Sequence, residues 1–88
     1  MKLIRGDIVF YARILPYVNV YEVCELIIRS IQETYFVGVD KRDKRAYLFG
    51  YSALDKNVFK HRKDALETVI VAEENKPKVS EETYYEEY

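Results

Sequence analysis

The sequence is poor in the residue types that build catalytic and metal sites. It has no tryptophan, a single cysteine, Cys24, a single histidine, His61, and three glycines that stand far apart. One cysteine cannot form an internal disulfide, no Cys/His cluster has the spacing of zinc ligands, and no glycine-rich loop is present to hold phosphate. The fifteen Asp and Glu are scattered or gathered near one end, not paired as acid–base catalysis requires. We therefore expect no enzyme activity, no metal and no cofactor.

Long apolar runs are also missing. No stretch approaches the ~18 consecutive apolar residues of a membrane-spanning helix. Charges at Arg5 and Asp7 interrupt the first residues before they reach the apolar length of a signal peptide. The chain is nevertheless 49% apolar and 33% charged, which is the composition of a globular protein. We expect one cytoplasmic domain with a single small core and no membrane contact.

The net charge of −1 conceals two parts of opposite sign. Residues 1–72 carry twelve Lys and Arg against nine Asp and Glu, a net of +3, whereas residues 73–88 carry two against six, a net of −4. The segment that follows Pro77 has little that would pack as a helix face. We interpret residues 1–76 as the folded domain and residues 77–88 as a flexible, acidic, tyrosine-rich tail.

The first two thirds of the chain have the pattern of short strands. Segments rich in β-branched and aromatic residues lie at 7–15, 20–31, 34–39, 45–51 and 58–59. The polar segment 40–44 predicts an antiparallel hairpin, and the length of 20–31 predicts a bend or bulge around 25–28. Gly38 indicates a bend or a close approach of two backbones. Cys24, in the middle of a strand, is expected to be a buried and inert residue.

The spacing of the apolar residues changes from that of a strand to that of a helix over residues 62–75. One apolar stripe is formed by Ala65, Leu66, Val69, Ile70 and Ala72. His61 stands at the N-cap position, where it is a poor cap and is expected at the surface. A few short strands cannot cover both faces of an open sheet. We therefore predict a mainly β fold, a small SH3-like antiparallel barrel with one C-terminal helix; the alternative is an α+β open antiparallel sheet backed by that helix.

Two short stretches carry a resemblance to known proteins. Residues 6–11, GDIVFY, are similar to the GD-x-V-Y opening of many small SH3-like barrels. Residues 58–66, VFKHRKDAL, resemble the VF-x-x-R-x-x-A helix entry of short proteins from bacteriophages and mobile elements of Firmicutes. The resemblance covers most of residues 6–75. It implies an SH3-like fold in a phage setting, where some small proteins act inside the host cell and inhibit defence proteins such as a CRISPR nuclease.

Aromatic rings are the preferred functional signal. Nine tyrosines and four phenylalanines exceed what a small barrel can bury, and tyrosine is enriched at binding hot spots. We expect exposed rings at Tyr11, Tyr17 and Tyr21. The tail adds Glu81, Glu82, Tyr84, Tyr85, Glu86 and Glu87. These residues predict a non-enzymatic module that binds a protein of the host cell, and self-association is compatible with this function. In the plainer interpretation, the tyrosines only shield strand edges and the acidic tail only keeps the chain solvated.

Nucleic-acid binding is the alternative function. The basic residues gather on the predicted hairpin and at the helix entry, namely Lys41, Arg42, Lys44, Arg45, Lys60, Arg62 and Lys63. Brought together by the fold, they would contact phosphates. Asp40, Asp43 and Asp64 are interleaved with them and weaken the positive field, so a protein partner is preferred.

Overall fold

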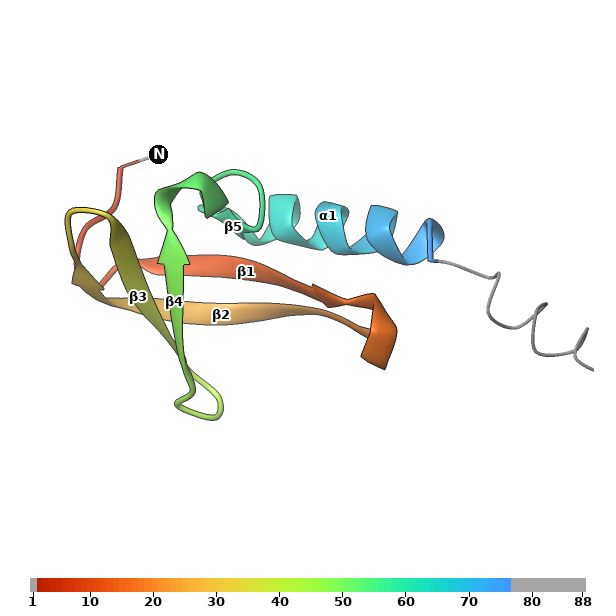
Figure 1. The fold of residues 1–88 in the computed structure, drawn as a ribbon, viewed down its shortest axis with the longest axis horizontal. Coiled ribbons are helices and arrows are strands. Elements are labelled where there is room, and N and C mark those ends of the chain that lie inside the picture. The colour runs from red at the N-terminus through yellow and green to blue at the C-terminus, as the bar shows by residue number, and fades with distance from the viewer. Residues whose placement is uncertain (1, 77–88) are drawn as a thin grey trace, which may run out of the picture.

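The structure is a computed structural model that describes residues 2–76. Its strands and helix are β1 (Ile8–Leu15), β2 (Val20–Ile31), β3 (Tyr35–Asp40), β4 (Ala46–Gly50), β5 (Val58–Phe59) and α1 (Arg62–Glu74) (Figure 1). Each predicted element is present, with ends that differ from the expected ones by no more than a residue. The predicted tail, residues 77–88, lies outside the described residues.

All five strands belong to one antiparallel sheet in the order β4-β3-β2-β1-β5. The first four strands form a meander of consecutive hairpins, and β5 joins the outer side of β1 through the pairs Phe10↔Phe59 and Tyr11↔Val58. Within residues 2–76, β4 and β5 are the two ends of the sheet and no ladder connects them. The prediction of a mainly β domain with one C-terminal helix is confirmed, and closure of the sheet into a barrel is not shown.

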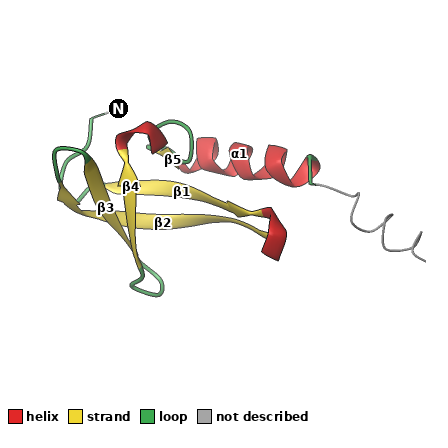
Figure 2. Cartoon of the chain, viewed as in Figure 1, coloured by secondary structure: helices red, strands yellow, loops and turns green. Residues whose placement is uncertain are grey.

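The sheet bends where β3 leaves β2. The pairing changes register between Ile28 and Ser30, which places a bulge at Arg29, just after the segment in which a bend was expected. Figure 2 shows β3 and β4 crossing the long β1–β2 ribbon at a steep angle. The backbone of Gly38 comes close to the Leu26 side chain, because a Cβ at this position would stand only 3.0 Å from Leu26 Cδ1. The glycine therefore marks a close approach.

Two clusters of buried side chains lie on opposite faces of β1 and β2, where chain length predicted a single core. Alternate residues of a strand point to opposite faces. One face carries Val9, Cys24, Leu26, Ile28, Phe36 and Val58. The other face carries Ala12 and Phe59, packed against Ala65 and Val69 of α1. The expectation of one core is wrong because the curved meander encloses one face of β1–β2 while the helix covers the other.

Helix α1 buries only part of its predicted apolar stripe. Ala65 and Val69 are buried, whereas Leu66 and Ile70 remain 47% and 46% exposed. His61 is exposed at the N-cap and makes no side-chain capping hydrogen bond, as expected of a poor cap. No helix within residues 2–76 is both long and apolar enough to cross a membrane.

Candidate functional site at the free edge of β2

Strand β2 extends beyond its partner β3. Their pairing ends at Leu26↔Asp40, followed by one more hydrogen bond of 3.1 Å from the Lys41 N–H to the Glu25 carbonyl. Among the described residues, the segment 20–24 of β2 therefore pairs with β1 only. We call this segment, on the side turned away from β1, the free edge. Its length follows from the twelve residues of β2 against the six of β3.

The direction of the backbone groups along the free edge follows from one residue. Ile28 donates its N–H to the Asp7 carbonyl and accepts from the Gly6 N–H, both at 2.8 Å, so its backbone groups point toward β1. Because the direction alternates along an antiparallel strand, the N–H and C=O groups of Tyr21 and Val23 point the opposite way. Unpaired groups of this kind are a template for another strand.

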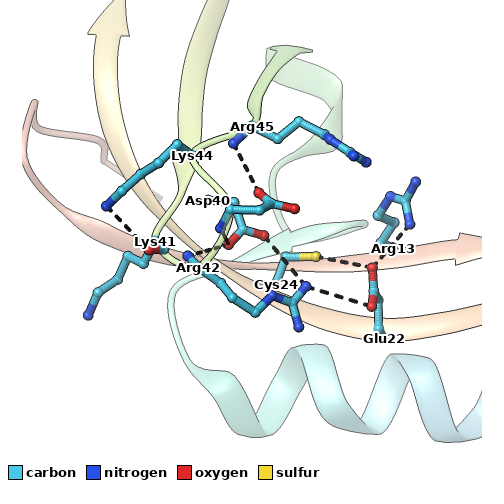
Figure 3. A network of polar contacts seen from close by, with 9 residues as sticks. Arg13, Glu22, Cys24, Asp40, Lys41, Arg42, Lys44 and Arg45 are labelled. Carbon is cyan, nitrogen blue, oxygen red and sulfur yellow. Dashed lines mark hydrogen bonds and ion pairs between the residues drawn. The ribbon is translucent and has the colours of Figure 1, made fainter.

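An arginine lies on each side of the free edge. Arg42, in the β3–β4 turn, extends over one face of β2, with its Nη2 atom 3.9 Å from a carboxylate oxygen of Glu22 (Figure 3). Arg62, the first residue of α1, lies on the opposite face, where it donates to Glu25 at 3.1 Å and stands 5.2 Å over the ring of Phe10. Arg42 and Arg62 thus come from distant parts of the chain to flank one strand.

A pocket of about 380 Å³ opens between these two arginines. It is lined by Val23, Cys24, Glu25, Asp40, Lys41, Arg42 and Arg62. The cations are more exposed than the carboxylates, since the side chains of Arg42 and Arg62 are 69% and 58% accessible whereas that of Glu25 is 31% accessible. Each guanidinium has five N–H donors. Donors therefore remain available to an anionic group that enters the pocket.

Asp40 positions the turn that carries Arg42. Its side chain is buried, and its Oδ1 atom accepts from the backbone N–H of Arg42 at 2.7 Å and of Asp43 at 3.4 Å. The turn closes with Lys44 in the left-handed region, at φ 65°, donating its N–H to the Asp40 carbonyl. An Asp that caps its own turn in this way is a recognised turn signal. The sequence placed Asp40 in the polar turn and among the charges that weaken the basic hairpin, but it did not predict this capping role.

The two carboxylates of β2 hold the cations in place. Glu22 accepts from Arg13, its cross-strand partner, at 3.0 Å. Glu25 accepts from Lys41 at 2.9 Å as well as from Arg62, and the hydrogen bond from Lys41 is the main cause that lowers the pKa of Glu25. Glu25 therefore stays ionised and joins the basic hairpin to the helix entry.

Cys24 lies beneath the pocket without the features of a nucleophile. It is 2% exposed, and burial raises the pKa of its thiol to about 12. His61 lines a different pocket, together with Asp7 and Lys60. The prediction that Cys24 is buried is confirmed. No group of three or more His, Cys, Asp and Glu in the described part of the chain has a geometry that would hold a metal ion.

The structure sorts the predicted basic residues into two sets. Lys41, Arg42 and Arg62 line one pocket, and Glu25 links Lys41 to Arg62. The remaining predicted residues are exposed but do not line it, namely Lys44, Arg45, Lys60 and Lys63. The two basic segments therefore meet at one point without merging into a continuous positive surface.

The predicted tyrosines divide in the same way. Tyr17 is 84% exposed in the 3-10 turn after β1, as expected. Tyr11 and Tyr21 are half-buried, so the expectation of exposed rings is wrong for both. The ring of Tyr11 packs edge-on against aromatic rings of β4, and Tyr21 packs against the cluster under α1. The predicted tail contacts, Glu81, Glu82, Tyr84, Tyr85, Glu86 and Glu87, lie outside the described residues.

Comparisons of the chain with protein-family models, with curated proteins and with solved structures found no match. The phage-like, SH3-like resemblance therefore remains a prediction. The assignment of a function rests on the geometry of the free edge and its two arginines.

Proposed function

We propose that this protein is a non-enzymatic protein-binding module that pairs an extended segment of its partner with the free edge of β2. Within residues 2–76, the outward backbone groups of Tyr21 and Val23 have no strand partner, and this observation carries the proposal. Addition of a strand to a sheet edge supplies main-chain hydrogen bonds, and the side chains beside the edge select the sequence.

The flanking side chains favour an acidic segment. Arg42 and Arg62 retain exposed donors on either side of the edge. Guanidinium groups form charge-assisted hydrogen bonds with carboxylates, and these bonds are about twice as strong as neutral ones. The partner is thus a protein that offers a short extended stretch with carboxylate side chains. Its identity as a host defence protein, and the closure of the fold into an SH3-like barrel, stay predictions from the resemblance.

Nucleic acid fits the same surface less well. A nucleic acid presents no row of backbone N–H and C=O groups with the spacing of a strand. The cations that line the pocket are also partly neutralised, because Glu25 contacts both Lys41 and Arg62 and Glu22 contacts Arg42. A nucleic-acid footprint would need a stronger positive field.

Fluorescence anisotropy of the full-length chain tests the proposal. The probe is a short labelled peptide of Val and Thr with adjacent Glu residues, compared with the same peptide containing Gln in place of Glu. So that the chain supplies no acidic segment of its own, four glutamates are replaced by glutamine, namely Glu81, Glu82, Glu86 and Glu87. We expect saturable binding of the acidic peptide only.

A matched pair of variants locates the binding. Val23→Pro removes the outward N–H, whereas Val23→Ala shortens the side chain and keeps the N–H. We expect Val23→Pro to weaken binding at least about fivefold relative to Val23→Ala, the effect of one lost hydrogen bond. Far-UV circular dichroism confirms that both variants are folded. Equal affinities of the two variants would refute the edge as the site, and preferential, steeply salt-dependent binding of mixed-sequence DNA or RNA would favour the alternative function.

A further inference from the structure

The chain leaves α1 near the ring of Tyr21. The helix runs along the β1–β2 ribbon (Figure 1), from Arg62 at the Glu25 end to Glu74. Two residues later, Lys76 Nζ stands 5.2 Å over the ring of Tyr21. The side chain of the last described residue therefore reaches the Tyr21 end of β2, on the face of the sheet that α1 covers.

The segment that follows is long enough to return along this edge. Residues 77–88, twelve in number, span roughly 40 Å when extended, at about 3.3 Å per residue. At the same rise per residue, the stretch of β2 from Tyr21 to Glu25 is only about 13 Å long. A reversal over residues 77–78 would bring residues 79–82 beside residues 21–24 of β2.

The charges of this segment match the two arginines. Adjacent residues of a strand point to opposite faces, so one acidic pair places one carboxylate near Arg42 and the other near Arg62. Glu81 and Glu82 form such a pair at the position that the chain length favours. A second pair, Glu86-Glu87, falls about 16 Å further along the chain, past the arginines.

We propose that residues 79–82 bind along the free edge of β2 in the same chain, with Glu81 and Glu82 held by Arg42 and Arg62. The proposal rests on the proposed function, because it uses the same edge, and it names the pattern that the edge recognises, namely two adjacent carboxylates on an extended strand. A segment tethered by so short a linker acts at a millimolar effective concentration. The chain thus carries an internal competitor that any partner must displace.

Amide hydrogen exchange, followed by NMR on the full-length chain, tests this inference. In the unmodified chain we expect slow exchange at the outward amides of Tyr21 and Val23. Glu81→Gln with Glu82→Gln should accelerate both by about fivefold or more, the effect of losing hydrogen bonds. The amide of Cys24 points toward β1 and should not change, which makes it an internal reference.

The second acidic pair supplies the matched control. Glu86→Gln with Glu87→Gln changes the charge by the same amount, and we expect exchange at Val23 to stay within about twofold of the unmodified chain. An equal effect of the two double variants would overturn the inference, since it would indicate a non-specific charge effect. Protection that grows with protein concentration would also overturn it, because the segment would then come from a second copy.

The labelled acidic peptide separates this inference from the proposed function. We expect it to bind the Glu81→Gln, Glu82→Gln chain at least about fivefold more tightly than the unmodified chain. Equal binding to both chains, still weakened by Val23→Pro, would keep the free edge as a binding site and refute its internal occupant. Absence of binding to any variant would refute the proposed function itself.

Discussion

Replacement of Gly38 by alanine tests the packing at the point where β3 crosses β2. The new Cβ would stand 3.0 Å from Leu26 Cδ1 and 3.2 Å from Leu26 Cβ, which is tighter than ordinary van der Waals contact. Rotation of the Leu26 side chain relieves only the first contact, and Leu26 is fully buried. Overpacking of this kind costs about 1–3 kcal/mol. Alanine has less conformational freedom than glycine in the unfolded chain, which offsets about 0.4–1 kcal/mol of this cost. We therefore expect the free energy of unfolding to fall by about 1–2 kcal/mol.

Urea unfolding followed by circular dichroism measures this loss, which corresponds to a fall in Tm of about 4–16 °C for a domain of this size. Gly50→Ala is the matched control, because its Cβ would find Ser52 Oγ at 4.0 Å and its φ of −73° suits alanine. Leu26→Ala alone should cost about 2–5 kcal/mol. In that background Gly38→Ala should cost less than it does alone, because Cδ1 is gone. A Gly38→Ala variant as stable as Gly50→Ala would refute the close approach.

Three further predictions concern single side chains. His61 has the extended backbone of an N-cap, φ −117° and ψ 137°, without a capping hydrogen bond. His61→Asp should therefore raise the free energy of unfolding by about 1 kcal/mol in urea, and an equal gain from His61→Ala would contradict this explanation. Burial raises the pKa of Cys24 from 9.0 to about 12, so the stability that depends on its neutral thiol is fully present below pH 9 and is lost as the pH rises toward 12. Urea midpoints should fall over that range less steeply in Cys24→Ala, and identical slopes would disprove the linkage. The pKa of Glu25, measured by NMR titration, should lie below its ordinary value and rise in Lys41→Met; an unchanged pKa would show that the ion pair is not formed in solution.

The order and type of the secondary-structure elements could be predicted because their signals are local. Runs of β-branched and aromatic residues mark strands without reference to the rest of the chain. The polar segment 40–44 marks a hairpin, and apolar residues at helical spacing mark α1. The bulge at Arg29 was anticipated to within a residue from the length of β2 alone.

Which side chains meet could not be predicted in the same way. The alternation in β1 separates Val9 and Tyr11 from Phe10 and Ala12, but it does not say that the meander encloses the first pair and α1 covers the second. For this reason the molecule has two buried clusters where one core was predicted, and the ring of Tyr11 is half-buried where it was expected to be exposed. The number of aromatic rings, compared with the volume of a small barrel, indicates that some rings are exposed. It does not indicate which of them are buried.

The candidate site was accessible to sequence reasoning only in part. Lys41, Arg42 and Arg62 were recognised as basic, but their convergence depends on the path of β3 over β2. The sequence does not single out Glu25, although its position in β2 makes it the residue that joins the two basic segments. The mismatch between a twelve-residue strand and a six-residue neighbour was the signal that would have disclosed the free edge.

The connectivity of the sheet also determines the order in which the molecule assembles. Strands β1 to β4 are joined by short turns, so their contacts close small loops and form rapidly. Strand β5 pairs with β1 only after the chain has closed the much larger loop from Phe10 to Phe59, and α1 follows it. We expect β5 and α1 to detach from the sheet in native-state fluctuations more readily than the meander unfolds. Each such opening would uncover Ala12 and its neighbours on the face of the sheet that α1 covers.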